Sequence, residues 1–255
     1  MRTLTLSRKP NAATIDELVS KARFIIGQQG DESLEDYLKY HQERLALDLD
    51  WLSSSLERSS RILEVGGFPF FLTSALLDRG YRLEVIDKLS DLAATLTQSH
   101  GLKVTECDIE REKLPFADGS FDDILFNEVF EHMRLDLVGT MEEVFRVLRP
   151  KGRLWLSTPN LGSLRGIINL LLKNESWAVV GDGVYAQYMH LRKTGWMGHV
   201  REYTSKEVVD FLLAIGFKLE VLVYRGGYTN PLAQGLSTLI PRLNPYFSCI
   251  ATKPQ

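Results

Sequence analysis

A glycine turn and an acid at the end of the following strand are the residues of this chain best suited to binding a ligand. The run from Ile62 to Gly67 reads as a buried strand that ends in two glycines, and a second apolar run ends in Asp87. Glycine has no Cβ and lets a ligand approach the backbone, while an acid at the tip of the next strand can accept hydrogen bonds from a ribose diol. This arrangement predicts a site for a nucleoside-containing cofactor.

The turn itself distinguishes between two kinds of cofactor. A dinucleotide fingerprint needs G-x-G-x-x-G, whereas residues 66–71 read Gly-Gly-Phe-Pro-Phe-Phe. A turn with Phe68 and Pro69 is a poor cradle for a pyrophosphate. Glu64, in the preceding strand, would repel a pyrophosphate but could hold the ammonium group of an amino-acid moiety, directly or through water. The residues therefore favour S-adenosylmethionine over NAD.

An alternation of strands and helices has to position these residues. Apolar runs and turn residues predict strands at 61–65, 82–86, 103–106, 121–126 and 153–158, and helices at 72–79, 91–99 and 136–148. A capping box from Thr204 to Glu207 begins a further helix that ends at Ile215. Strands near 217–224 and 246–252 would form a hairpin-like pair at the edge of the sheet. The alternation predicts an α/β fold with a seven-stranded, doubly wound, mostly parallel sheet.

The residues ahead of the sheet read differently. Residues 1–12 read as a loose tail, and residues 14–57 read as two or three helices with apolar faces. We expect 1–57 to form an N-terminal helical cap on the cofactor side, and 58–255 to form the cofactor-binding α/β domain.

Residues 58–160 resemble the class I S-adenosylmethionine-dependent methyltransferases in six segments that occur in the family's order. These segments are Ile62–Gly66, Leu83–Asp87, Cys107–Ile109, Leu114–Asp122, Asn127–His132 and Val147–Gly152. The resemblance implies a Rossmann-like fold and methyl transfer from S-adenosylmethionine. The chain departs from the family at Phe68 and Phe70, which stand where the second and third glycines are often found.

The spacing of three acids, Glu64, Asp87 and Asp108, predicts where they lie in the fold. Asp87 follows Glu64 by 23 residues and precedes Asp108 by 21, each about one βα unit. All three should therefore lie at neighbouring strand ends, facing the crevice where open α/β sheets bind ligands. The alternatives are that Asp87 only caps a helix or turn and that Asp108 is a solvated loop acid.

The resemblance also assigns roles to individual residues. Asp87 would accept hydrogen bonds from the ribose hydroxyls, and Asp108 would bind the adenine amino group with Ile109 against the ring. Asn127 would line the methionine end of the cofactor. The whole expected cofactor set is Glu64, Gly66, Gly67, Asp87, Asp108, Ile109 and Asn127. The two glycines could instead form a turn with a structural role alone.

Two histidines are candidates for a general base. Methyl transfer to a hydroxyl requires loss of the hydroxyl proton, and imidazole titrates near neutral pH. His132 follows Glu131 at the tip of the fourth strand, and His199 lies just before the capping box. Either histidine could instead hydrogen-bond only within the fold. For His41, on an apolar-sided helix, packing is the preferred interpretation.

The segment 161–203, after the fifth strand, is predicted to be a lid insertion that selects the substrate. Its first part, 161–173, reads as an apolar helix with Arg165 and Lys173 as its only cations. Packing on the domain is the preferred interpretation, and the alternatives are a dimer contact or an interfacial helix near a lipid-linked substrate. The aromatic residues and cations that follow could bind a sugar face, an anionic group or a polyketide.

Composition narrows the class of protein. The chain has 255 residues, 44% of them hydrophobic and 25% charged, which is enough to bury one substantial core. A net charge of −3 and the lack of a long Lys/Arg block disfavour a nucleic-acid partner. Cys107 and Cys249 are far apart and outside any metal-binding spacing, so we expect neither a disulfide framework nor a metal site.

The location and function follow from the same observations. Residues 1–10 lack an apolar signal core, and no run reaches the roughly 18 apolar residues of a membrane span, so we expect a cytoplasmic protein. The leading function is methyl transfer to a small molecule, with a hydroxyl in a glycan, lipid-linked or secondary-metabolite pathway as acceptor. A loose similarity of 199–216 to such enzymes favours that acceptor class. The alternatives are a non-catalytic cofactor-binding or scaffold protein and an NAD-dependent oxidoreductase, the latter disfavoured by the absent G-x-G-x-x-G. The oligomeric state stays open.

Overall fold

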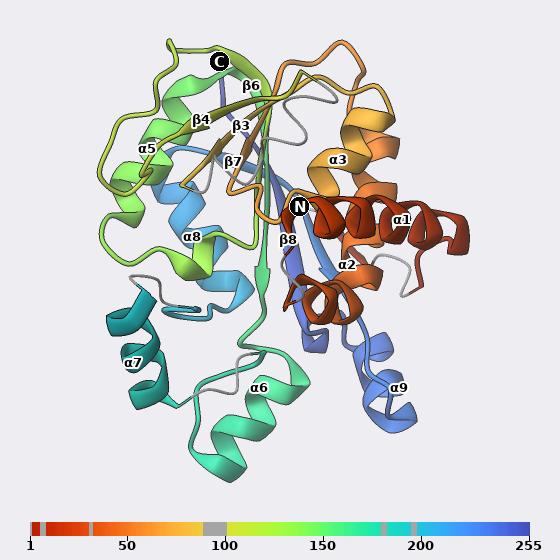
Figure 1. Cartoon of the computed structure of the whole chain (residues 1–255). Helices are drawn as coiled ribbons and strands as arrows, with labels where there is room; N and C mark the ends of the chain where they lie inside the picture. The colour runs from red at the N-terminus through yellow and green to blue at the C-terminus, as the bar shows by residue number, and fades with distance from the viewer. Residues whose placement is uncertain (1, 6–8, 31–32, 89–100, 180–182, 195–197) are drawn as a thin grey trace.

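The computed structural model describes residues 2–5, 9–30, 33–88, 101–179, 183–194 and 198–255. Within these residues, eight strands form one sheet in the spatial order β1-β7-β8-β6-β5-β2-β3-β4 (Figure 1). In chain order the strands are Arg2–Thr5, Ile62–Val65, Leu83–Asp87, Lys103–Glu106, Phe121–Asn127, Leu148–Pro159, Lys218–Arg225 and Tyr246–Thr252. β8 runs antiparallel to β6 and β7, and the other pairs are parallel. The predicted doubly wound α/β sheet is confirmed, with β2 to β8 as its seven strands.

Helices cover both faces of the sheet, as parallel strands require. α1, α2 and α3 lie on one face, and α5 and α8 lie on the other (Figure 1). The bounds of these helices are Ala12–Gln29, Ser33–Ser55, Phe71–Asp78, Leu137–Val147 and Ser205–Ile215. All four residues of β2 are buried, which explains why its sequence is a continuous apolar run around a single acid. The helix expected at 91–99 lies outside the described residues.

The order of the strands fixes where a ligand can bind. From β2 the chain moves to β3 and β4 on one side, and it then returns to place β5 and β6 on the other side of β2. The carboxyl ends of β2 and β5 therefore flank the point where the winding reverses. In open α/β sheets this is the crevice that receives the ligand.

The N-terminal residues differ from the expected tail. Arg2–Thr5 form β1, which pairs in parallel with β7 in the register Arg2 to Val221. The prediction of a loose tail is wrong for these four residues, because they find a partner more than 200 residues along the chain. As a result β7 lies inside the sheet and is not an edge strand, although its antiparallel pairing with β8 is as predicted.

α2 runs along the central strands of the sheet, and its contacts extend from near the start of β6 to just beyond the carboxyl end of β5. At its C-terminal end the Ser55 carbonyl accepts a hydrogen bond from Arg153 at 3.2 Å, near the start of β6. One turn earlier the ring of Trp51 packs edge-on against Trp155, with ring centres 5.2 Å apart. Earlier in the helix, Arg44 lies 3.6 Å from the Glu128 carboxylate, just beyond the end of β5. The helix thus brings charged side chains to the ligand-binding edge.

Apart from α8, the helices that follow β6 and β7 lie at the end of the molecule beyond the carboxyl edge of the sheet (Figure 1). They are α6, η3, α7, α9 and η4, with bounds Leu164–Ile168, Asn169–Lys173, Val184–Thr194, Pro231–Leu239 and Pro241–Leu243. In the part of the chain that the structure describes, every helix is too short or too polar to cross a membrane.

Candidate active site

The turn after β2 is pressed against the chain that follows β5. The Gly66 N–H donates to the Ile86 carbonyl at 2.9 Å, and Gly66 has a φ of 72°. A Cβ at Gly66 would lie 2.6 Å from Cγ2 of Val129, and one at Gly67 would lie 2.9 Å from Cγ1 of Val85. Space at both positions, and the backbone conformation at Gly66, therefore demand glycine, a requirement that holds with or without a ligand.

Asp87 lies directly beside this turn. Its Oδ2 accepts a hydrogen bond from the Phe68 N–H at 2.9 Å, and the residue is buried. The turn and the acid, expected at neighbouring strand ends, are thus in contact. An ionised carboxylate offers about four acceptor positions, so Asp87 can hold the turn and also accept hydroxyl donors.

The two phenylalanines that replace family glycines do not occupy the same environment. Phe70 has a φ of 65°, precedes α3 and is completely buried in the core. Its ring meets that of Phe68 edge-on, with centres 6.1 Å apart. Because Phe70 points into the core, the bulk of its side chain is directed away from the surface where a ligand would approach.

Glu64 is a buried acid beneath the first turn of α3. Its Oε2 accepts a hydrogen bond from the Thr73 hydroxyl at 2.7 Å. Burial, opposed by the Thr73 hydrogen bond and assisted by the nearby Asp87 carboxylate, raises the pKa of Glu64 to about 7. An ammonium group brought close to this carboxylate would favour its ionised form, which is the behaviour expected of a residue that senses an amino-acid moiety.

Asp108 and Ile109 follow β4 at the same edge. Lys88, directly after β3, lies 3.0 Å from Oδ1 of Asp108 and ties the two strand ends together. Burial raises the pKa of Asp108, but its hydrogen bond to Lys88 and other contacts outweigh that effect and hold the pKa below its usual value. Ile109 packs at the margin of the core, and its carbonyl accepts the Thr140 hydroxyl at 2.8 Å. Asp108 is thus the most solvated of the three expected cofactor acids.

Asn127 closes β5 and lines a small internal cavity of about 10 Å³. Trp51 and Leu52 of α2 line it from one side, and Trp155 lines it from the sheet. A cavity of this size holds one water molecule at most. Its position under α2 shows that the end of β5 faces the N-terminal helices, and contact of Asn127 with the methionine end stays a prediction.

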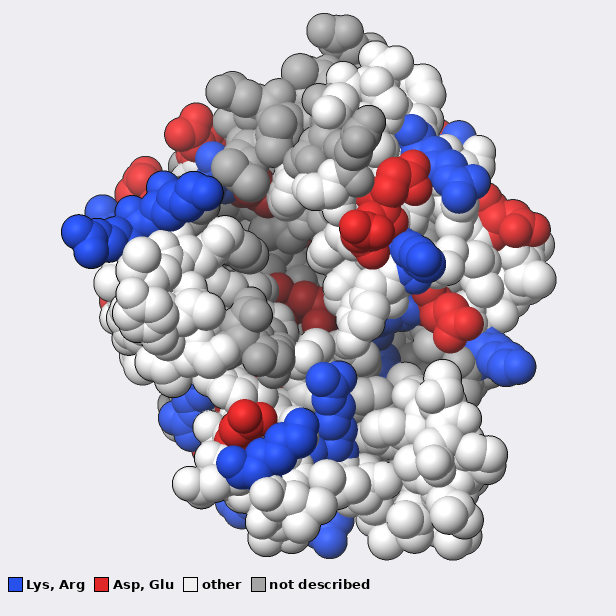
Figure 2. All heavy atoms as spheres, turned by 60° about the horizontal axis from the view of Figure 1, so that its bottom comes forward, with Lys and Arg blue, Asp and Glu red and all other residues white. Residues whose placement is uncertain are grey.

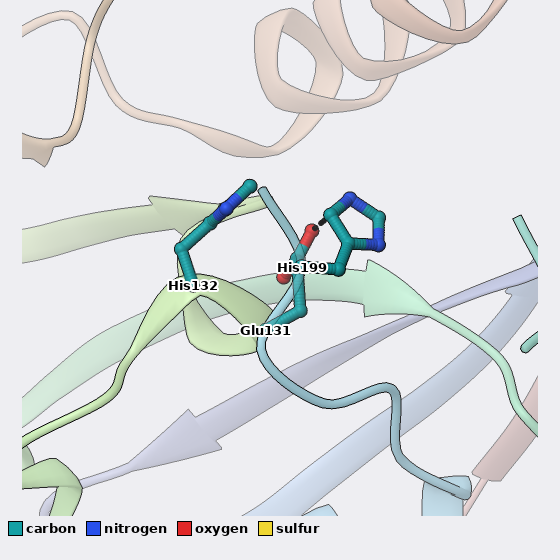
Figure 3. Close-up of side chains that lie close together, drawn as sticks. All are labelled: Glu131, His132 and His199. Carbon is teal, nitrogen blue, oxygen red and sulfur yellow. Dashed lines mark ion pairs between the residues drawn. The ribbon is translucent and has the colours of Figure 1, made fainter. Parts of the chain in front are cut away.

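The two candidate bases lie side by side. The rings of His132 and His199 are nearly perpendicular, with centres 4.9 Å apart, and the Glu131 carboxylate lies next to them (Figure 3). Glu131 and His132 belong to the short helix η2, Phe130–His132, after β5. The Glu131 carbonyl accepts the Val200 N–H at 2.7 Å, which brings His199 to this place.

Hydrogen bonds define which nitrogen of each imidazole is available. Nδ1 of His199 lies 3.1 Å from Oε1 of Glu202, and Nδ1 of His132 lies 2.9 Å from the Gly198 carbonyl. A carboxylate or carbonyl can only accept, so both Nδ1 atoms carry a proton and Nε2 is the basic nitrogen when the ring is neutral. Nε2 of His199 then points to Oε1 of Glu131, 3.8 Å away.

The charges around His199 affect its protonation. Burial lowers its pKa, but the Glu202 hydrogen bond and the Glu131 charge outweigh burial and hold the pKa above its usual value. Burial, with repulsion from Glu128, raises the pKa of Glu131 to about 8. Such an interacting pair titrates as a unit. The His199 side chain is 15% exposed and that of Glu131 is fully buried, so the imidazole is the member that a substrate can reach.

Glu131, His132 and His199 are also residue types that bind metal ions. The ligand atoms of Glu131, His132 and His199 lie within 4.8 Å of one another. Two ligands with bonds of about 2.1 Å to one zinc ion can be at most about 4.2 Å apart. One of these separations, from Nε2 of His199 to Oε1 of Glu131, is 3.8 Å and within that limit, so the cluster could hold a metal ion as well as take part in proton transfer.

A buried charge network beside this cluster was missed in the sequence. Arg225, at the end of β7, is almost completely buried and lies 2.7 Å from Asp48 and 3.3 Å from Glu128. Arg44 lies 3.6 Å from Glu128, and the ring of Tyr246 lies 5.8 Å from both guanidinium groups. The sequence offered one sign of this network: Arg44 and Asp48 are four residues apart on a predicted helix, with only apolar residues between them. These five described residues come from α2, the loop after β5, β7 and β8, and they lie together near the carboxyl edge of the sheet, where a ligand would bind.

Comparison with known proteins agrees with this geometry. A family model described as a methyltransferase domain matches residues 54–156. The biotin biosynthesis bifunctional protein BioHC of Cellvibrio japonicus is 31% identical over 116 residues, which are 46% of this chain and 23% of that protein. The chain therefore matches less than two thirds of that relative's length.

Solved structures share the fold at lower identity. A methyltransferase of Methanosarcina mazei superposes with a TM-score of 0.55 at 21% identity, over 80% of this chain and 97% of that one. The 1,6-didemethyltoxoflavin-N1-methyltransferase of Burkholderia thailandensis, solved with S-adenosylhomocysteine, gives 0.55 at 18% identity, over 96% of this chain and 89% of that one. Residues 54–156 thus match a methyltransferase-domain family, and the whole chain shares the fold of solved S-adenosylmethionine-dependent methyltransferases. These matches agree with S-adenosylmethionine as the cofactor, and its contact with the glycine turn, Asp87 and Glu64 stays a prediction.

Proposed function

We propose that this chain methylates a hydroxyl group of a small molecule, in a glycan, lipid-linked or secondary-metabolite pathway. The observation that supports this proposal is the imidazole of His199, held by the buried Glu202 at the carboxyl edge of the sheet. Glu202 fixes Nδ1, and Nε2 lies 3.8 Å from Oε1 of Glu131, too far for a hydrogen bond, so Nε2 can accept a proton from a substrate, as a general base does. Acceptors that are already nucleophilic, such as thiolates, have no need of it.

In the proposed reaction, His199 removes the proton of the acceptor and Glu202 stabilises the charge that His199 gains. S-adenosylmethionine, when bound, supplies an electrophilic methyl group on a positively charged sulfur. Nε2 of His199 takes the hydroxyl proton as the acceptor oxygen forms its bond to the methyl carbon. Glu202 stabilises the imidazolium that results, because its carboxylate lies 3.1 Å from Nδ1. The sulfur keeps the electron pair of the broken bond, so charge and atoms balance.

Glu202 is itself well supported for this role. It is buried, and its carboxylate accepts N–H groups from Ala178 and Val179. These donors favour the ionised carboxylate, which a buried acid would otherwise resist. We propose 161–203 as the lid over the acceptor, since it contains both the base and the backbone that holds Glu202.

Binding and turnover experiments test the proposal in two stages. Calorimetry with S-adenosylmethionine, S-adenosylhomocysteine and NAD should show binding of the first two and none of NAD. A panel of hydroxylated acceptors with isotopically labelled methyl donor should then show label in an ether product. Label that appears only on amines or thiols would overturn the hydroxyl assignment, and binding without turnover on any acceptor would favour the non-catalytic alternative.

Glu64→Gln is expected to reduce the pH dependence of stability in the protein without cofactor. The pKa of Glu64 is about 7 in the fold and near its usual value of 4.5 in the unfolded chain. A raised folded pKa gives stability that is complete below the unfolded pKa and is lost as pH rises through the folded pKa. The wild type should therefore lose about 2 kcal/mol from this residue between pH 5 and pH 7.

Urea unfolding at the two pH values measures this effect. Glu57→Gln, which alters an exposed acid, serves as the matched control and should follow the wild type. If Glu64→Gln loses as much free energy of unfolding over this range as the wild type, Glu64 is ionised in the folded protein and the proposed sensing of an ammonium group fails.

A further inference from the structure

Three helices at one end of the molecule expose large apolar side chains. Leu171 and Leu172 of η3 are 75% and 80% exposed, and Leu232 and Leu239 of α9 are 80% and 81% exposed. Tyr185 of α7 is similarly uncovered. Single exposed leucines are ordinary, but apolar side chains gathered on neighbouring helices mark a surface that contacts something. We call the exposed face of α6, η3, α7 and α9 the apolar end.

The charge of the apolar end differs from that of the chain as a whole. Its described residues, 161–179, 183–194 and 226–245, contain five Lys or Arg and one acid, Glu175. The five cations, all exposed, are Arg165, Lys173, Arg192, Lys193 and Arg242. The whole chain has a net charge of −3. Figure 2, in which this end is turned forward, shows a mainly white lower surface with blue groups at its borders.

The apolar end also surrounds the approach to the candidate active site. Asn160, directly after β6 and four residues before α6, donates hydrogen bonds to the carbonyls of Arg242 and Asn244, which joins this segment to the region after α9. Glu202 holds Ala178 and Val179, between η3 and α7, and also orients His199. Figure 2 shows a hollow in this side of the molecule with acidic groups at its base.

The charge pattern decides between two coverings of this surface. A second copy packed face to face would oppose five cations with five cations and one acid with one acid, so the contact would be repulsive. A membrane that contains anionic lipids complements both features, because leucines enter the acyl boundary while Lys and Arg contact lipid phosphates. We propose that the apolar end docks on an anionic membrane surface.

This inference goes beyond the proposed function, since docking requires no catalysis. Docking would also add a substrate class to the proposed function. An acceptor with a lipid tail, held in the membrane, would lie next to the hollow that leads to the candidate active site. Docking is measured without acceptor or turnover, so its failure is distinct from failure of methyl transfer.

Vesicle co-sedimentation of the full chain tests the proposal. The vesicles are phosphatidylcholine alone and phosphatidylcholine with roughly 30 mol % phosphatidylglycerol. We expect binding to the anionic vesicles, weakened by high salt, and at least ~10-fold weaker binding for the double variant Leu171→Ser/Leu172→Ser. Lys173→Gln/Arg242→Gln should lose about fivefold for each cation removed.

A control variant removes exposed apolar side chains elsewhere on the molecule. Leu135 and Val138 are about half exposed near the start of α5, and Leu135→Ser/Val138→Ser should bind vesicles like the wild type. Calorimetry with S-adenosylmethionine shows that each variant is folded. The proposal is overturned if the folded wild type ignores anionic vesicles, or if Leu171→Ser/Leu172→Ser binds them unchanged. A dimer in analytical ultracentrifugation that this variant dissociates, without vesicle binding, would instead assign the surface to a second copy.

Discussion

Replacement of His199 by alanine should lower kcat by about 10²- to 10⁴-fold, because a positioned imidazole contributes an effect of that size to proton removal. The affinity for S-adenosylmethionine should stay close to that of the wild type. His199 lies beyond the cofactor strands and contacts Glu131 and Glu202 rather than the glycine turn. Single-turnover rates with a preformed cofactor complex measure the chemical step directly.

Two further variants separate a base from a packing residue. In the wild type kcat should rise with pH, since the unit of His199 and Glu131 must lose a proton and the pKa of Glu131 is about 8. Glu131→Gln removes a negative charge that raises the pKa of His199, so the rising limb should move to lower pH. His132→Ala should alter binding as well as turnover. Chemistry at the wild-type rate in His199→Ala would exclude that residue from the mechanism.

Replacement of Asp87 by alanine should weaken S-adenosylmethionine binding by about 1–3 kcal/mol, roughly 5- to 150-fold in Kd. Two losses contribute. The ribose hydroxyls lose a charged acceptor, and the Phe68 N–H loses the partner that holds the glycine turn. Calorimetry on the folded variant measures the change.

Companion variants distinguish the two losses. Asp87→Asn keeps an oxygen for the Phe68 N–H but removes the charge, so it should fall between wild type and alanine. Asp108→Ala should cost less than Asp87→Ala, because Asp108 is the more solvated acid. Glu84→Ala, on the same strand but paired with Arg61 at the surface, is the control for strand stability. Unchanged affinity in a folded Asp87→Ala would place the ribose elsewhere.

The core of the sheet was predictable because burial leaves a local signature. Strands β2, β3 and β5 lie within one or two residues of their predicted bounds, since each is a short apolar run between turn residues. The first residues of β6 were not predicted to be strand. Leu148 pairs with Phe121, and a register shift separates this pair from the next one, Arg153 with Asp123. β1 was missed because a strand of four residues shows too little pattern, and its partner lies far along the chain.

The candidate site was predictable only in part. Asp87 and Asp108 could be placed from the sequence, because each follows an apolar strand and a parallel sheet brings the ends of its strands together. The network of Arg44, Glu128 and Arg225 joins a helix, a loop and a strand from distant parts of the chain. No spacing rule connects such residues, since their proximity arises only when α2 packs on the sheet. The role of Glu202 was missed likewise, although it lies three residues after His199.

Glu202 links the backbone of the segment proposed as a lid to the imidazole proposed as the base. The same carboxylate accepts the backbone of Ala178 and Val179 and orients the imidazole of His199. If the proposed lid carries that backbone away, the Glu202 carboxylate loses two of its hydrogen-bond donors and with them part of what holds it beside His199. We therefore expect the entry of an acceptor and the orientation of the proposed base to be coupled through this one carboxylate.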